Sequence, residues 1–261
     1  MSTYKDAGVD IDAGDRAVEL MKASIAKASR KEVIGGIGGF AGLFDASAMK
    51  SMQQPLLATS TDGVGTKTEI ARILGKYDTI GEDLVAMVVD DLVVCGAEPL
   101  FMTDYIAVGK VIPERIAAIV GGIARGCEKA GTALVGGETA EHPGLLGEDE
   151  FDIAGAATGV VDAHLQLGSH RVKSGDVLIA MPASGIHANG FSLVRHILAT
   201  HKIDITAHNT EFGRTLGEVL LTPTEIYALD CLALIRSLKE NLRTFSHITG
   251  CLLYTSDAAD E

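Results

Sequence analysis

The chain has 261 residues, of which 47% are hydrophobic, and a formal net charge of −13 at pH 7. This length allows one large domain or two medium ones with their own cores, and the composition excludes a disordered chain. The acidic charge argues against nucleic acid as the main partner, because most of the surface would repel a phosphate backbone.

The N-terminus and the cysteines predict a cytoplasmic protein with no membrane partner. The first twelve residues carry three acids and no apolar core, so they are not a signal peptide. No run of residues approaches the roughly 18 apolar residues of a membrane span. The four cysteines are widely spaced and form no C-x-x-C pair, which is typical of reduced thiols.

The first predicted helix runs from about residue 12 to residue 30 and is capped by Asp12 to Asp15. Its buried stripe consists of apolar residues at three- and four-residue spacing, namely Val18, Met21, Ile25 and Ala28. Lys22 lies off this stripe. It is either a solvated surface lysine or a contact for nucleotide phosphates.

The most glycine-dense stretch, Gly35 to Gly42, contains a formal G-x-G-x-x-A match that begins at Gly36. A nicotinamide dinucleotide site requires a strand before the glycines and a helix after them, and the flanking residues support neither. A loop that closes over phosphates suits the composition better. Its candidate contacts are Gly35, Gly36, Gly38 and Gly39. A dehydrogenase remains an alternative that requires a strand-turn-helix unit within residues 33 to 50.

Thr61 to Lys67 reads Thr-Asp-Gly-Val-Gly-Thr-Lys and has the composition of a phosphate and metal site. A strand is predicted over residues 55 to 58 and a helix over residues 66 to 77, so the loop lies where anions bind readily. Asp62 offers a hard oxygen ligand for Mg²⁺. The other candidates supply bare backbone, a hydroxyl and a positive charge: Gly63, Gly65, Thr66 and Lys67. The alternative is an ordinary glycine turn.

A long helix is predicted from Gly81 to Cys95, with Asp90 and Asp91 inside it. Acids at mid-helix beside a core are salt-bridge partners or metal ligands more often than caps. Asp90 lies almost directly above Asp83 on such a helix, which favours it as the partner of another carboxylate. The periodicity leaves open whether Asp90 or Asp91 faces a ligand.

Strands are predicted from Phe101 to Gly109 and from Thr132 to Val135, with a helix from Pro113 to Ala130 between them. The second strand is followed by a glycine pair, an acid and a hydroxyl, namely Gly136, Gly137, Glu138 and Thr139. This group is either a tight turn or a phosphate or metal contact. The two other sites of this kind in the chain favour a contact.

A strand from Ile153 to Val161 closes the first predicted domain, and a polar, basic stretch around Leu165 to Gly175 marks a boundary. We therefore predict domains at residues 1–168 and 169–250. The second domain is expected to begin with a strand from Asp176 to Met181.

His187 lies among small residues at a predicted strand-to-helix turn. It is either a ligand contact or a turn histidine bonded to nearby backbone. Helices are predicted from Phe191 to about Thr200 and, later, up to about Glu240, and a strand is predicted to start at His247. Residues 251–261 continue no pattern of the chain.

The assembled segments resemble the aminoimidazole ribonucleotide synthetase family, the cyclo-ligases of purine biosynthesis. The matching segments begin at residue 4 and end at residue 250: Tyr4 to Asp12, Gly35 to Phe40, Thr61 to Lys67, Asp91 to Pro99, Gly136 to Ala140, Ser184 to Gly190, Pro223 to Tyr227 and His247 to Gly250. The family's ATP signature, Asp followed after four residues by Gly-Ala-x-Pro, selects Asp91 over Asp90.

The resemblance implies an α/β and α+β two-domain fold. The N-terminal α/β domain forms a barrel across a homodimer in this family, and the active site lies between it and the C-terminal α+β domain. The implied reaction closes the imidazole ring of formylglycinamidine ribonucleotide: ATP phosphorylates the formyl oxygen, a nitrogen attacks the resulting carbon, and phosphate leaves. Such a catalyst depends mainly on positioning and electrostatics.

The family pattern also implies roles for individual residues. Asp62 and Asp91 would hold Mg²⁺ on the ATP phosphates, with Glu138 as a weaker candidate. Lys22 and Lys67 would neutralise phosphate charge under the closing glycine loop. His187 would meet the substrate and assist proton transfer.

The chain departs from the family at three places. Asp90 stands where many relatives carry Asn, and Ala188 stands where Ser is usual. The family continues after His-Ile-Thr-Gly, whereas residues 251–261 are unrelated, so we interpret the C-terminal domain as incomplete and this tail as an artefact. We expect the chain as given to be poorly stable or inactive, because half a domain leaves apolar strands exposed.

Two further alternatives stay open. One is a related ATP-dependent enzyme that activates another acceptor, although the chain lacks the early reactive cysteine of a selenophosphate synthetase. The other is a noncatalytic dimeric fragment that binds nucleotide weakly, which intact Mg-ATP ligands without cyclisation would support.

Overall fold

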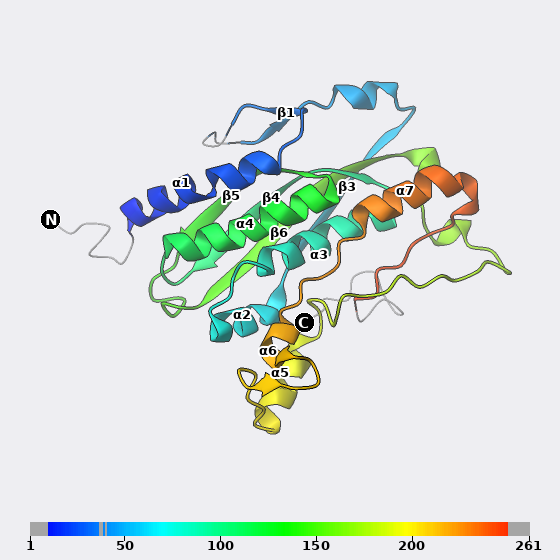
Figure 1. Cartoon of the computed structure of the whole chain (residues 1–261). Coiled ribbons are helices and arrows are strands. Elements are labelled where there is room, and N and C mark those ends of the chain that lie inside the picture. The colour runs from blue at the N-terminus through cyan, green and yellow to red at the C-terminus, as the bar shows by residue number, and fades with distance from the viewer. Residues whose placement is uncertain (1–9, 37–38, 40, 250–261) are drawn as a thin grey trace.

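A four-stranded mixed sheet forms the centre of the computed structural model, which describes residues 10–36, 39 and 41–249 (Figure 1). In spatial order the strands are β3 (Pro55–Gly63), β6 (Phe151–Asp162), β4 (Glu98–Val108) and β5 (Ala133–Glu141). β6 pairs antiparallel with both β3 and β4, whereas β4 and β5 are parallel. A parallel pair needs a crossover connection, which α4 (Pro113–Ala130) supplies.

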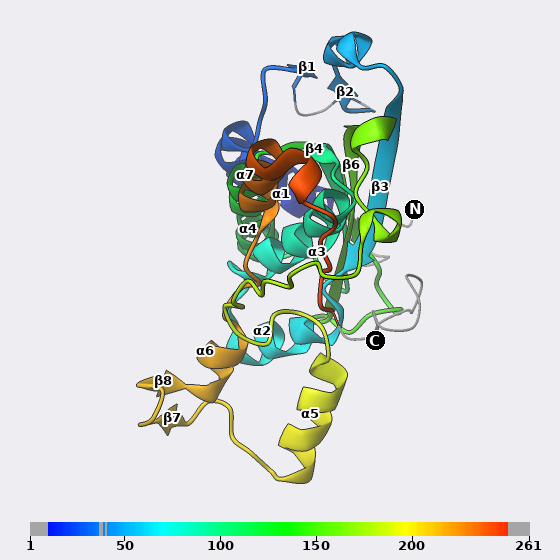
Figure 2. The same cartoon turned by 90° about the vertical axis from the view of Figure 1, so that its right-hand side faces the viewer.

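Helices cover one face of the sheet, as Figures 1 and 2 show. α3 (Ile80–Val94) packs on β3 and β6, α4 packs on α3 and β5, and α1 (Ile11–Lys27) packs on α4. α7 (Ala228–Leu238), from the C-terminal part of the chain, packs against α3 and α4. α3 is therefore almost entirely buried.

The observed ends of α4 agree with the capping residues predicted from the sequence, whereas the start of α1 does not. α4 begins at Pro113 and is followed by Gly131 in a left-handed conformation with φ of 68°, as predicted. α1 begins earlier than predicted, and Asp10 caps it by accepting the N–H of Ala13 at 3.1 Å. The predicted cap at Asp12 to Asp15 is therefore wrong. Met21 and Ala28 are buried as predicted, but Val18 is exposed.

Close contact between α3 and α4 depends on glycines. A Cβ on Gly122 would lie 2.6 Å from the carbonyl oxygen of Asp78 and 3.1 Å from the backbone nitrogen of Gly81. A Cβ on the adjacent, equally buried Gly121 would meet only side-chain atoms of Arg125 and Ser24, at 3.8 Å.

Gly122→Ala is expected to lower the free energy of unfolding by about 1–3 kcal/mol, because the added methyl forces the two helices apart. Gly121→Ala is the matched control, and we expect it to stabilise the protein by up to about 1 kcal/mol through helix propensity. Urea unfolding of both variants is the measurement. Equal effects of the two substitutions would contradict the packing argument.

The glycine-dense stretch lies in a hairpin and not in a dinucleotide-binding unit. β1 (Val33–Ile34) pairs antiparallel with β2 (Leu43–Phe44), and a short 3-10 helix (Ser47–Ser51) follows. No crossover helix or parallel strand follows the glycines within the described part of residues 33 to 50. The dehydrogenase alternative is therefore contradicted.

The sequence predicts a short strand that ends at Val135, but β5 continues through Gly136 to Glu141. The sheet makes this continuation possible, because β4 offers partners as far as Val108. Gly137 pairs with Asp104, and a Cβ on Gly137 would lie 2.2 Å from the Asp104 Oδ1 atom. The glycine pair thus lies within a strand beside a carboxylate, and the tight-turn interpretation is wrong.

The ionisation of Asp104 is expected to make the stability of the protein depend on pH. Burial raises the pKa of Asp104 to about 7, from an ordinary value of 3.8. Between these pH values the folded state holds a proton that the unfolded chain has lost, so stability falls as the pH rises through this range. Asp104→Asn carries no charge, and we expect it to be more stable than the unaltered chain by about 1–2 kcal/mol at pH 8. The difference should shrink at pH 4.5 and nearly vanish at pH 3 in urea unfolding, because both states are protonated below pH 3.8. A larger difference at pH 3 than at pH 8 would contradict it.

The C-terminal part lies mostly beyond one end of the sheet (Figure 2). Its regular elements are α5 (Phe191–Thr200), β7 (His208–Asn209), β8 (Arg214–Thr215), α6 (Leu216–Leu220) and α7. α5 has the predicted bounds. α6 begins with a capping box between Thr215 and Glu218.

Two strands predicted in this part are wrong. Residues 176–181 form no strand, and Val177, Leu178 and Ile179 are 82%, 97% and 87% exposed. Residues 247–249 are also irregular. A strand needs a neighbour for its N–H and C=O groups, and no other described segment pairs with either one. Among the described residues, no helix is both long and apolar enough to cross a membrane.

Candidate functional site

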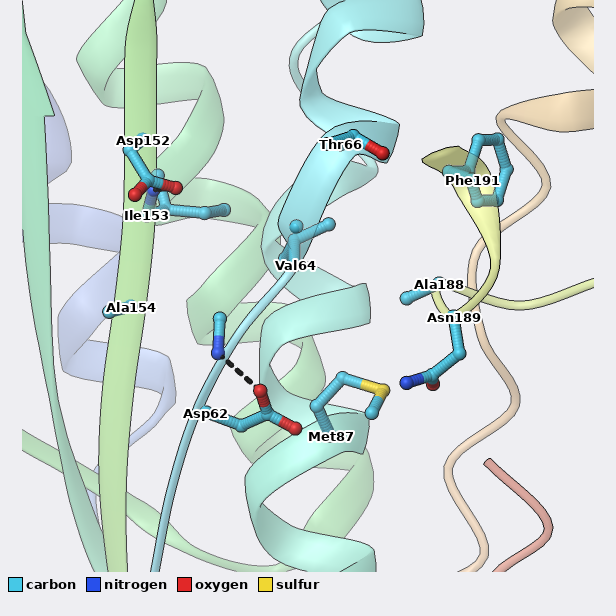
Figure 3. Close-up of a pocket in the computed structure, with 12 residues that line it drawn as sticks. Asp62, Val64, Thr66, Met87, Asp152, Ile153, Ala154, Ala188, Asn189 and Phe191 are labelled. Carbon is cyan, nitrogen blue, oxygen red and sulfur yellow. Dashed lines mark hydrogen bonds between the residues drawn. The ribbon is translucent and has the colours of Figure 1, made fainter. Parts of the chain in front are cut away.

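A pocket of about 310 Å³ lies where the end of β3 meets β6 and the segment that leads into α5 (Figure 3). Four parts of the chain line it: residues 62–66 at the end of β3 and just beyond it, Met87 of α3, residues 152–154 of β6, and a group formed by Ala188, Asn189 and Phe191. Figure 3 shows the β6 residues on one side and the 188–191 group on the other, with Asp62 and Met87 between them.

The predicted phosphate loop forms the floor of this pocket. Asp62 and Gly63 are the last residues of β3, a 3-10 turn (Gly65–Lys67) follows, and α2 (Thr68–Leu74) begins directly after it. The predicted helix over residues 66 to 77 is thus shorter and begins with a tighter turn. The Asp62 Oδ1 atom accepts the N–H of Gly63 at 2.7 Å.

Gly63 and Gly65 are each required in this loop for a different physical reason. Gly65 has a φ of 65°, a left-handed conformation that favours glycine. A Cβ on Gly63 would lie 3.1 Å from the carbonyl oxygen of Ile153 on β6. Thr66 then joins the loop to α5, because its hydroxyl lies 3.1 Å from that of Ser192.

Lys67 is fully buried, and its ammonium group does not line the pocket. It donates to Asp83 at 2.8 Å and to the carbonyl oxygens of His187 and Thr222 at 2.9 and 2.8 Å. Burial lowers the pKa of Lys67, and the charge of Asp83 opposes this shift. The predicted phosphate contact of Lys67 is corrected to an internal tie, because all three N–H donors are used inside the protein.

Asp83 and Asp90 lie on one face of α3, as their seven-residue spacing predicts. Both bind backbone of the segment before α7: Asp83 accepts from the N–H of Thr224 at 2.8 Å, and Asp90 from that of Tyr227 at 3.1 Å. Burial raises the pKa of Asp90 to about 7, although the Tyr227 N–H opposes this shift. Asp90 therefore binds the backbone of the segment before α7 and holds that segment on α3. It is not the partner of another carboxylate.

Asp91 lies on the more exposed side of α3. Its Oδ2 atom accepts the Ser60 hydroxyl at 3.2 Å, and its Oδ1 atom lies 3.1 Å from Nδ1 of His247. Burial opposes a charged imidazole, but the hydrogen bond to Asp91 and the charges of Asp90, Asp91 and Asp62 outweigh it, so the pKa of His247 is raised. His247 is thus an unpredicted member of the acidic region that contains Asp62 and Asp91.

His187 lies in a strained turn beside the pocket, with a φ of 59°. Its Nε2 atom accepts the N–H of Ser184 at 3.2 Å, which is the turn arrangement named as the alternative to a ligand contact. Burial and the nearby charge of Lys67 lower the pKa of His187. Its neighbours Ala188 and Asn189 line the pocket directly.

Several predicted residues lie elsewhere. Lys22 is exposed on α1 and pairs with Glu19. The hairpin that carries Gly35, Gly36 and Gly39 lies at the opposite end of β3 from the pocket in both views, and Gly38 lies outside the described residues (Figures 1 and 2). The pocket lining also lacks the β5 candidates Gly136, Gly137, Glu138 and Thr139, as well as Thr61 and Asp91.

Six lining residues outside the predicted loop were not named as candidates from the sequence: Met87, Asp152, Ile153, Ala154, Asn189 and Phe191. Asn189 stands inside the Ser184 to Gly190 motif, so its side-chain amide was a signal. Asp152 had none, because only the antiparallel pairing of β6 with β3 brings it to the pocket. No cluster of three or more His, Cys, Asp or Glu residues arranged for a metal ion occurs in the described ranges.

Two family models match consecutive parts of the chain. The AIR synthase related protein N-terminal domain matches residues 44–161, and the AIR synthase related protein C-terminal domain matches residues 173–256. The chain therefore has the two-domain α/β fold of these proteins, with the mixed sheet in the N-terminal domain.

Solved structures agree with this fold. A thiamine-monophosphate kinase from Stenotrophomonas maltophilia K279a superimposes with a TM-score of 0.53 at 19% identity, over 84% of this chain and 63% of that one. HypE from E. coli superimposes with a TM-score of 0.50 at 20% identity, over 71% of this chain and 54% of that one.

Curated relatives are much more similar in sequence. The phosphoribosylformylglycinamidine cyclo-ligase of Desulfitobacterium hafniense is 53% identical over 249 residues, which are 95% of this chain and 72% of the relative. The enzyme of the same name from Lachnospira eligens is 50% identical over 247 residues, with the same two shares. At this identity and coverage, the chain belongs to the phosphoribosylformylglycinamidine cyclo-ligase family of ligases.

Proposed function

We propose that the chain closes the imidazole ring of formylglycinamidine ribonucleotide to give aminoimidazole ribonucleotide, with ATP converted to ADP and phosphate. One observation carries the proposal: relatives with this enzyme name are 50–53% identical over 95% of the chain. The pocket supports it, because its lining combines Asp62, two glycines and Thr66 with the Asn189 amide from the other domain.

Mg²⁺ is the proposed cofactor beside ATP. The ion prefers oxygen ligands and usually takes only one or two protein carboxylates, with phosphates and water completing its shell. Asp62 and Asp91 offer such oxygens and lie in one acidic region around His247. A set of two carboxylates therefore fits the ion, and the ion would neutralise phosphate charge as the phosphoryl group is transferred.

The protein's own groups have distinct roles in this proposal. Gly65 is exposed and lines the pocket, so its backbone admits an anion to the floor of the pocket. Asn189 orients the acceptor, and the Lys67 hydrogen bond to the His187 carbonyl holds the 187–189 turn beside it. A neutral His187 imidazole, favoured by its lowered pKa, is suited to accept a proton once its bond to Ser184 opens. This proposal assigns no role to Lys22, because Lys22 is exposed on α1 and does not line the pocket.

A homodimer is the proposed assembly. The face of the sheet opposite the helices carries exposed apolar side chains, with Leu57 of β3 66% and Tyr105 of β4 41% exposed. A second copy of the chain placed on this face would remove them from water, in accord with the barrel that the family resemblance implies.

The test is a direct assay of the purified chain with Mg-ATP and formylglycinamidine ribonucleotide, with the Lachnospira eligens relative as the positive control. Aminoimidazole ribonucleotide formed with one ADP per product supports the proposal. ADP formed only with another acceptor, such as thiamine monophosphate, would assign the chain to a different ATP-dependent reaction. Soluble, folded chain that binds ATP but forms no product would leave it as a nucleotide-binding protein.

A further inference from the structure

The described residues that line the pocket are acidic. They include the carboxylates of Asp62 and Asp152 but no lysine, arginine or histidine. A pocket that offers charge of one sign only favours a ligand group of the opposite sign. Two positive groups can therefore be accommodated, one at each carboxylate.

The two carboxylates lie on different walls and in different surroundings. Asp62 is at the end of β3, and its charge, like that of Asp91, acts on His247. Asp152 is at the start of β6, past the last residue pair of β3 with β6, which joins Gly63 to Ala154. Figure 3 shows Asp152 across the pocket from Asn189.

Asp152 has acceptor capacity to spare. Its Oδ1 atom accepts the N–H of Ile153 at 2.9 Å, and within the described residues this is its single interaction. An ionised carboxylate has about four lone-pair sites, so a further pair of N–H groups can bind. The other lining residues on this side of the pocket are Ile153 and Ala154. Their side chains are apolar, so they form no hydrogen bonds with a ligand.

We propose that Asp152 is the subsite for the amidine group of the substrate, which deepens the proposed function and rests on it. The relatives' name specifies a formylglycinamidine. An amidine is a strong base that carries a positive charge at neutral pH, and its planar pair of N–H donors has the fork geometry of a guanidinium. Two parallel N–H···O bonds to one carboxylate are the strongest form of such recognition.

This subsite selects the amidine over the corresponding amide. Formylglycinamide ribonucleotide has an oxygen in place of one nitrogen and is neutral. That oxygen would face the Asp152 carboxylate without a proton between them, and one hydrogen bond and the charge attraction would be lost. Asp152 therefore sets specificity for the amidine nitrogen that becomes the exocyclic amino group of the aminoimidazole product.

The test compares both ribonucleotides by calorimetry, without ATP or Mg²⁺, on the full chain and on Asp152→Asn. We expect the unaltered chain to bind the amidine more tightly than the amide. Asp152→Asn should weaken amidine binding on the order of 10- to 100-fold and leave amide binding unchanged or improved. Asp149→Asn is the matched control, because Asp149 is 71% exposed and lies outside the pocket lining.

Thermal unfolding of Asp152→Asn verifies that the variant is folded. Unchanged amidine affinity, or equal loss for amidine and amide, would overturn the subsite while leaving the proposed function intact. Loss of affinity for MgCl₂ alone, with an unchanged preference for the amidine, would reassign Asp152 to a metal ion. Failure of the unaltered chain to bind the amidine would overturn the proposed function and the subsite together.

Discussion

Replacing Lys67 by methionine is expected to lower the free energy of unfolding by about 3–5 kcal/mol, because removal of one partner leaves a buried charge uncompensated. Lys67 and Asp83 are both completely buried and 2.8 Å apart. The Oδ2 atom of Asp83 already lacks a hydrogen-bond partner among the described residues, so the carboxylate depends on the bonds to its Oδ1 atom. The carbonyl oxygens of His187 and Thr222 would also lose their donor.

Urea unfolding of Lys67→Met measures this effect. The matched control is Lys76→Met, which removes a lysine from a 2.6 Å pair with Glu218 whose partners are 50% and 35% exposed. We expect this control to change stability by less than about 1 kcal/mol. The double variant Lys67→Met with Asp83→Asn should recover part of the loss, because the unpaired charge is gone. Similar losses of unfolding free energy for Lys67→Met and Lys76→Met would contradict the stabilising role of the buried Lys67–Asp83 pair.

Asp62→Asn is expected to lower kcat for the proposed ring closure roughly 10²- to 10³-fold, the scale for loss of one preorganised electrostatic group. The amide keeps an acceptor for the N–H of Gly63, so the turn at the end of β3 should persist. It removes the negative charge that we propose for Mg²⁺, so the Mg²⁺ concentration needed for half-maximal rate should rise as well.

Steady-state kinetics over a range of Mg²⁺ concentrations distinguish this role from a structural one. Asp149→Asn provides the control again, since it removes an exposed carboxylate that does not line the pocket. If both variants kept the full kcat and the Mg²⁺ dependence of the unaltered chain, Asp62 would have no part in holding the ion.

Much of the N-terminal domain follows from local rules. The alternation of apolar and polar residues and the helix terminators predict α3, β4, α4 and β6 close to their observed bounds. Those signals are local, because Pro113 fixes its own φ and Gly131 can adopt the left-handed conformation whatever surrounds them. The same reasoning fails at residues 176–181, where an apolar run has no neighbouring strand to pair with.

The candidate site divides in the same way. Its composition is visible in the sequence, since Asp62, Gly63, Gly65 and Thr66 stand together in one loop and line one pocket. The role of Lys67 could not be predicted from the sequence. The phosphate-loop pattern is the same whether the lysine ammonium group faces the pocket or binds Asp83. Only the docking of the 222–227 segment on α3 makes that distinction.

The sequence by itself determined the family, the element pattern of the first domain and the loop at the floor of the pocket, because each depends on residues close together in the chain. The tertiary structure alone decided that Lys67 is an internal tie, that His247 joins Asp91, and that Asp152 faces Asn189 across the pocket. These contacts join residues that are far apart in the chain or on separate elements. Their geometry depends on strand pairing and helix packing, which no local pattern specifies.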